Sequence, residues 1–161
     1  MSILSTVYPS FIEKDPYTLA ISQNRASILI KMSMATAHFH TNHFPSTFAI
    51  LEEYLPGVLK TKCFNKNNYS FDREVLNTEI GHLFEHMILE VLCELKLEKG
   101  HKSAVFRGLT QWDWKKDEKG TFNITLYADT ADWDLFPKAL EKAEMILAKI
   151  LASPIRFSEA N

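Results

Sequence analysis

The chain has 161 residues, 46% of them hydrophobic and 24% charged, and these values predict one soluble globular domain. The formal net charge of −2 gives no general reason to bind nucleic acid or an anionic membrane surface. Two cysteines cannot form a disulfide framework, and the five glycines form neither a GxGxxG nor a GxxxxGK[ST] pattern. We therefore expect a reduced, cytoplasmic protein without a Gly-rich phosphate-binding loop.

The first 22 residues are expected to be a loosely structured lead-in, because they carry Pro9 and Pro16. They contain no basic n-region followed by an apolar run of signal-peptide length. No stretch of the sequence reaches the ~18 consecutive apolar residues of a membrane span. Residues 23–161 are then expected to form a single domain.

Strand and helix signals follow in order from residue 26. Alternating apolar residues over 26–34 predict a strand with one buried face. A short helix is predicted from Pro45 to Leu55, and the polar residues 61–70 are predicted to form a loop. A long helix is predicted from about Leu76 to Leu97.

The last third of the chain predicts a hairpin and a final helix. Strands are expected over 102–108 and 121–127, joined by the charged turn 115–120. The final helix is expected from about residue 132 or 134 to residue 152, with Pro137 in its first turn. The order β-α-α-β-β-α predicts an α+β fold, with helices packed on a small, mostly antiparallel sheet.

The long helix carries the pattern H-x-x-E-H on one face, the inverted form of the zincin motif. At ~100° per residue, His82 and His86 lie ~40° apart, and ~6 Å of axial rise separates them. Two imidazoles at this spacing can converge on one Zn²⁺. Glu85 flanks the pair and can act as the general base that takes a proton from water. Gly81, a poor helix former beside His82, predicts a close approach of backbone or ligand.

The same residues have a simpler interpretation, because any amphipathic helix has a polar face on which histidine and glutamate are common. Under this interpretation the chain is a non-catalytic module that binds a polymer or a partner protein. Metal content distinguishes the two hypotheses.

The segment from about Leu59 to Tyr127 resembles the N-terminal domain of cyanophycin synthetases. That domain carries a stretch of the form G-[ST]-W-x-G-H-x-x-E-H-[VI]-A-L-E-L-Q. The matching residues here are Gly81, His82, Glu85, His86, Leu89 and Glu90. Cys63 and Tyr69-Ser70-Phe71 occupy places comparable to a cysteine and a Gly-Phe segment of the family. Leu109 stands where the family has arginine, and the family's Trp and Gln around the motif are absent.

The resemblance implies a free-standing version of that domain, because the family's ATP-grasp and Mur-ligase-like portions have no counterpart in these residues. Some members look like metallopeptidases that trim a polymer of aspartate and arginine. Carried over by position, His82, His86 and Glu90 would be metal ligands, and Glu85 would be the general base. We therefore expect a metal-dependent hydrolase of peptide or isopeptide bonds, with that polymer as the implied substrate.

The third ligand has two alternatives at this point. Glu90 lies eight residues, ~12 Å of axial rise, from His82 and could instead support an imidazole through a hydrogen bond. Glu141 or Glu144 on the final helix would then complete the site. Two histidines and one carboxylate suit zinc, and they also suit manganese, iron or nickel.

Other chemistry-bearing residues have plainer interpretations. His38, His40 and His43 could form a second ligand cluster, but a polar loop after the first strand explains them. Cys93 could reach a metal beside His86, although a helical cysteine more often packs as a small apolar residue. Trp112 and Trp114 could stack on a guanidinium group or cover the hairpin.

Overall fold

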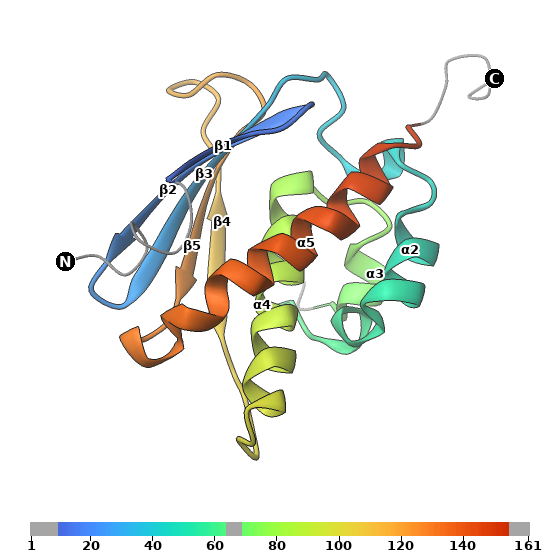
Figure 1. Cartoon of the computed structure of the whole chain (residues 1–161). Helices are drawn as coiled ribbons and strands as arrows, with labels where there is room; N and C mark the ends of the chain where they lie inside the picture. Colours follow the sequence, from blue (N-terminus) through green and yellow to red (C-terminus); the bar gives the residue numbers. More distant parts are fainter. Residues whose placement is uncertain (1–9, 64–68, 155–161) are drawn as a thin grey trace.

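The described residues, 10–63 and 69–154 of this computed structural model, contain one antiparallel sheet with the strand order β1-β2-β3-β5-β4 (Figure 1). Its strands are β1 (Phe11–Glu13), β2 (Tyr17–Asn24), β3 (Ser27–Met34), β4 (Arg107–Gln111) and β5 (Thr121–Tyr127). The helices all lie on one face of this sheet. The predicted α+β class is confirmed.

The expected element order was wrong at the N-terminal end, where β1 and β2 occupy part of the predicted lead-in. β2 pairs with β3 along its whole length, from Tyr17 opposite Met34 to Asn24 opposite Ser27. Tyr17, Leu19 and Ile21 alternate with more exposed residues and are buried, a strand pattern that the prediction overlooked. Pro16 lies just before the strand, where it removes no hydrogen bond from the sheet. Residues 1–9 of the predicted lead-in lie outside the described residues.

Two long helices form the layer next to the sheet, and shorter ones lie beyond them (Figure 1). The long ones are α4 (Ile80–Glu98) and α5 (Phe136–Leu151), and the short ones are α2 (Thr47–Tyr54) and α3 (Phe71–Glu74). A 3₁₀ turn, Thr130–Leu135, occupies the predicted beginning of the last helix. α3 was not predicted; it follows the predicted loop 61–70, of which residues 64–68 lie outside the described residues.

The first residues of α4 and β4 differ from the predicted ones because backbone pairing with other segments determines where these elements begin. α4 begins at Ile80 rather than near Leu76, since Thr78 and Ile80 bond the backbone of Thr41 and Phe39 at 2.7 Å each. The predicted strand 102–108 is observed as β4 over Arg107–Gln111, which begins at the residue that pairs with Tyr127 at the end of β5. The predicted strands 26–34 and 121–127 match β3 and β5 closely.

The core lies between the sheet and the two long helices. Alternate residues of β3 and β5 face it, and α4 presents an apolar face that meets them. The fully buried members on these three elements include Ile28, Ile30, Met32, Phe122, Ile124, Leu126, Leu83, Phe84, Met87 and Ile88.

Gly81 explains how closely α4 approaches the sheet. A Cβ at this position would lie 2.3 Å from Cγ of the buried Phe122. The predicted close approach is therefore a contact between the helix backbone and β5, not a ligand contact.

We expect Gly81→Ala to lower the free energy of unfolding by about 1–3 kcal/mol, because the added methyl overpacks this contact. Chemical denaturation measures the change. In a Phe122→Ala background, Gly81→Ala should lower the free energy of unfolding much less. An equal loss in both backgrounds would show that the contact with Phe122 is not the cause of the destabilisation.

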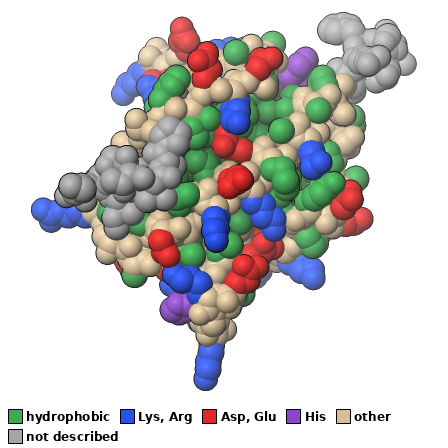
Figure 2. Space-filling model, viewed as in Figure 1, with side chains coloured by type: hydrophobic (Ala, Val, Ile, Leu, Met, Phe, Trp, Pro, Cys, Tyr) green, Lys and Arg blue, Asp and Glu red, His purple; other side chains and the backbone are tan. Residues whose placement is uncertain are grey.

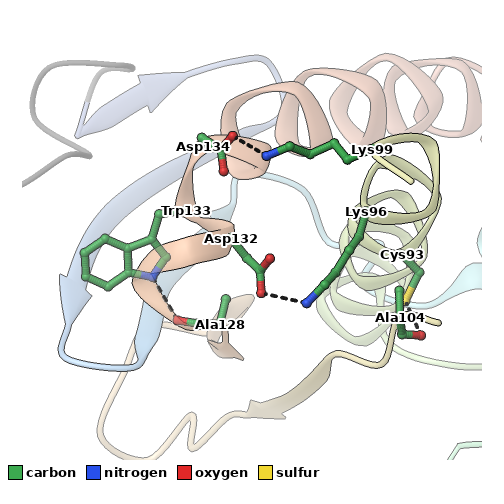
Figure 3. A network of polar contacts seen from close by, with 8 residues as sticks. All are labelled: Cys93, Lys96, Lys99, Ala104, Ala128, Asp132, Trp133 and Asp134. Atoms are coloured by element: carbon green, nitrogen blue, oxygen red, sulfur yellow. Dashed lines mark hydrogen bonds and ion pairs between the residues drawn. The ribbon is translucent and has the colours of Figure 1, made fainter. Parts of the chain in front are cut away.

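Ion pairs join the last turn of α4 and its C-cap residue Lys99 to the 3₁₀ turn before α5 (Figure 3). Lys96 Nζ lies 3.2 Å from Asp132 and Lys99 Nζ 2.9 Å from Asp134. The indole of Trp133 donates a hydrogen bond to the carbonyl of Ala128. These contacts hold the end of α4 against the connection that leads from β5 to α5.

Charged side chains of both signs are interspersed on the face shown in Figure 2, in keeping with the net charge of −2. Among the described helices, none combines the length and apolar character needed to cross a membrane.

Candidate metal centre

A pocket of about 930 Å³ lies over the polar side of α4. Its walls come from α4, from β4 with the residues before it, and from two stretches of chain around residues 61–63 and 74–79. His82, Glu85, His86 and Glu90, the four polar residues of the predicted motif, all line it. The pocket therefore gathers the predicted residues at one surface.

His82 and His86 lie side by side on α4, as their spacing predicts. Their ring centroids are 4.7 Å apart and the rings are nearly perpendicular. The sulfur of Cys63 lies 3.3 Å from Nε2 of His82. One ligand atom from each of Cys63, His82 and His86 lies within 4.8 Å of the other two, so this group can hold a metal ion.

Two neighbours orient the imidazoles. The hydroxyl of Thr78, in the turn before α4, lies 2.8 Å from Nδ1 of His82. With Nδ1 protonated and donating to Thr78, Nε2 presents its lone pair toward the Cys63 sulfur. The ring of Phe71, at the first residue of α3, stacks on His86 with centroids 4.0 Å apart and planes 10° apart. Both imidazoles are thus held in fixed orientations.

The electrostatics of the group suit metal binding. Burial lowers the pKa of His82, although the nearby Glu79 opposes this shift. Burial, with a smaller effect of His82, lowers the pKa of His86 to about 3. Both imidazoles are therefore neutral at pH 7, and neutral imidazole is the form that ligates a metal.

Glu85 is the most buried acid of the pocket, with 5% of its surface exposed. Its Oε1 accepts a 2.7 Å hydrogen bond from the hydroxyl of Thr110 on β4. Burial raises the pKa of its carboxyl to about 7, and the Thr110 hydrogen bond partly opposes this shift. A carboxyl with a pKa near the working pH is suited to exchange protons with a substrate.

We expect Thr110→Val to raise the pKa of Glu85 in the metal-free protein above about 7. The substitution keeps the branched shape but removes the hydroxyl that stabilises the carboxylate. A ¹³C NMR titration of the Glu85 carboxyl measures the change. An unchanged or lower pKa would contradict the assigned role of this hydrogen bond.

Glu90 lines the pocket but lies outside the Cys63, His82 and His86 group. A Cβ on Gly57 would lie 2.3 Å from its Oε1, so its carboxylate lies against the 3₁₀ turn Pro56–Lys60. Its distance along the helix from His82 accounts for this placement. Burial, followed by the charge of Glu94, raises its pKa.

The alternative ligands on the last helix lie elsewhere. Glu141 and Glu144 line a second pocket, which they share with Tyr17, and the Tyr17 hydroxyl donates a 2.9 Å hydrogen bond to Glu144. Tyr17 lies at the beginning of β2, so α5 directs these acids toward the N-terminal strands. Neither lines the pocket over α4.

The other candidate residues lie outside the Cys63, His82 and His86 group, although Cys93 also lines the pocket over α4. His38, His40 and His43 cluster, with His38 and His43 centroids 4.6 Å apart, but the described residues place no metal-capable group there. Cys93 donates to the Ala104 carbonyl at 3.6 Å. The indole of Trp114 donates to the Thr121 carbonyl, so it covers the hairpin, whereas Trp112 lines the pocket.

Sequence reasoning missed Cys63 as a ligand and Thr78, Phe71 and Thr110 as orienting residues. The only signal for Cys63 was its match to a cysteine of the resembled family. Neither periodicity nor spacing relates a loop cysteine to a histidine 19 residues later.

No protein-family model matches this sequence, and no curated protein matches it either. Fold and site together define an α+β protein with a Cys-His-His group that can hold a metal ion.

Proposed function

We propose that this protein is a zinc-dependent hydrolase of amide bonds, with zinc held by Cys63, His82 and His86 and with Glu85 as the general base. The observation that carries the proposal is the gathering of these four residues at one pocket. Three protein ligands are typical of catalytic zinc, which keeps its fourth position open, whereas structural sites are closed by four.

The donor set favours zinc among the metals that the motif allows. The thiolate of Cys63 takes the place of the carboxylate ligand expected from the sequence. A thiolate is a softer ligand than a carboxylate, and this weighs against manganese. Imidazole suits zinc, iron and nickel alike. When bound, the metal would supply Lewis-acid polarisation of the substrate carbonyl and activation of water.

The remaining chemistry belongs to residues of this chain. Glu85 accepts a proton from the attacking water while the water oxygen bonds to the carbonyl carbon of the substrate. The carbon–nitrogen bond then breaks, and Glu85 returns that proton to the departing amine. Thr110 holds the carboxyl in place through its hydroxyl, and Thr78 and Phe71 fix the two imidazoles. The resemblance to the cyanophycin synthetase domain adds an aspartate-arginine polymer to the candidate substrates.

The experiment compares metal-stripped protein with the same protein reloaded with zinc. Each is incubated with a mixed peptide pool and, separately, with aspartate-arginine polymer, and the products are identified by mass spectrometry. We expect stoichiometric zinc and hydrolysis only in the reloaded protein. A folded protein that retains no zinc and hydrolyses neither substrate would instead be the non-catalytic binding module.

A further inference from the structure

β4 is an edge strand beside the pocket. It is the last strand in the sheet order, so one side of its backbone pairs with β5 and no described strand pairs with the other (Figure 1). Four of its residues, Arg107, Gly108, Leu109 and Thr110, line the pocket over α4. An edge strand offers unpaired backbone donors and acceptors to another chain.

The register of β4 on β5 identifies which residues of β4 offer unpaired backbone donors and acceptors. Ala128 N donates to Ala26 O, and Met34 N donates to Gly120 O, so the even-numbered residues of β5 bond β3. Backbone groups of successive residues point to opposite sides of an antiparallel strand. The odd-numbered residues of β5 therefore bond Arg107, Leu109 and Gln111.

Gly108 and Thr110 consequently direct their N–H and C=O groups away from β5. Among the described residues, no backbone hydrogen bond engages these groups. Two residues at this spacing present the donor and acceptor pattern that one added strand requires.

The same two residues lie against Glu85. Thr110 donates its hydroxyl hydrogen to the Glu85 carboxylate, and a Cβ on Gly108 would lie 3.0 Å from Glu85 Cγ. The open edge therefore runs past the proposed general base. Val105, 84% exposed, and the half-exposed Trp112 lie on either side of β4 and can receive apolar side chains of a bound chain.

We propose that the substrate is an extended α-peptide that adds as a strand to the outer edge of β4, through the backbone groups of Gly108 and Thr110. This assignment rests on the proposed function and specifies its substrate class. Strand addition explains why the pocket wall beside Glu85 is a bare strand edge, since main-chain bonds give affinity and alternate side chains give specificity. It favours linear peptides over branched isopeptide linkages, because pairing needs a regular run of backbone amides.

Backbone hydrogen exchange tests this proposal. Zinc-loaded Glu85→Gln protein is mixed with a pool of proline-free hexapeptides, and exchange rates along β4 are measured by NMR. We expect the amides of Gly108 and Thr110 to exchange at least about tenfold more slowly with the pool. The amides of Leu109 and Gln111, already bonded to β5, should change little. The matched control is a pool of the same composition with every amide N-methylated, which should protect nothing.

A pair of variants at Thr110 provides a second measurement. Thr110→Pro removes the outward N–H without removing a bond to β5, and edge strands tolerate proline there. Thr110→Val retains that N–H and serves as the control, since both variants lose the hydroxyl. We expect the proline variant to bind the peptide pool at least about tenfold more weakly than the valine variant.

The outcomes separate this proposal from the proposed function. Hydrolysis of the peptide pool by the unmodified, zinc-loaded protein, without protection of Gly108 and Thr110, would overturn strand addition alone. Protection without hydrolysis of either the peptide pool or the aspartate-arginine polymer would support strand addition and overturn the hydrolase. If Gly108 and Thr110 are not protected and neither substrate is hydrolysed, both proposals are overturned.

Discussion

Glu85→Gln is expected to lower the rate of peptide hydrolysis by at least about 100-fold, because general-base catalysis contributes roughly 10²–10⁴-fold. The amide keeps the shape of the side chain but cannot take a proton from water. Zinc content should not change, since Glu85 is not one of the three grouped ligands. Steady-state kinetics and elemental analysis of the same preparation measure both effects.

Glu94→Gln is the matched control for this variant. It is the same substitution on the same helix, at a residue that pairs with Lys142 and does not line the pocket. Its activity should equal that of the unmodified protein. Full activity of Glu85→Gln would contradict the role assigned to Glu85, and loss of zinc from it would show that the residue also supports the metal site.

Cys63→Ser is expected to lower zinc affinity by at least about 100-fold. Loss of an outer hydrogen-bond partner already costs roughly 10–100-fold in metal affinity, and Cys63 is proposed as a direct ligand. Serine preserves the size of this buried side chain, so the fold should persist. Competition with a chromogenic chelator measures the affinity, and circular dichroism checks the fold.

Cys93→Ser and Glu90→Gln are the controls that make this result specific. Cys93 is the other cysteine of the chain and bonds the Ala104 carbonyl, and Glu90 is the ligand that the motif implies. Both variants should keep their zinc. Retention of zinc by Cys63→Ser together with its loss from Glu90→Gln would replace the proposed ligand set with the set expected from the sequence.

Local signals were sufficient to predict the elements that carry strong periodicity. The alternation over 26–34 and 121–127 predicted β3 and β5, because each has one face in the core. The helix with two faces was predicted as well, apart from its first turn. That turn is lost to pairing between residues 39–41 and 78–80, which are distant in sequence. β2 was not predicted, although Tyr17, Leu19 and Ile21 alternate, because Pro9 and Pro16 before it are typical of irregular segments.

The half of the site that lies on one helix was predictable for the same reason. His82, Glu85 and His86 are positioned by the helical repeat alone, so their spacing predicts their neighbourhood. Cys63 and Thr110 reach the site through the tertiary fold, from a connection before α3 and from the edge of the sheet. Glu90 was assigned by its place in a motif, but its distance along the helix directs it toward Gly57.

The measurement that tests the Cys63, His82 and His86 site most directly is X-ray absorption at the zinc edge on zinc-loaded protein. We predict one sulfur at ~2.3 Å and two imidazole nitrogens at ~2.0–2.1 Å, with the remaining position taken by a lighter atom that exchanges with solvent. A spectrum with nitrogen and oxygen neighbours but no sulfur, or a protein that retains no stoichiometric zinc, would contradict the site.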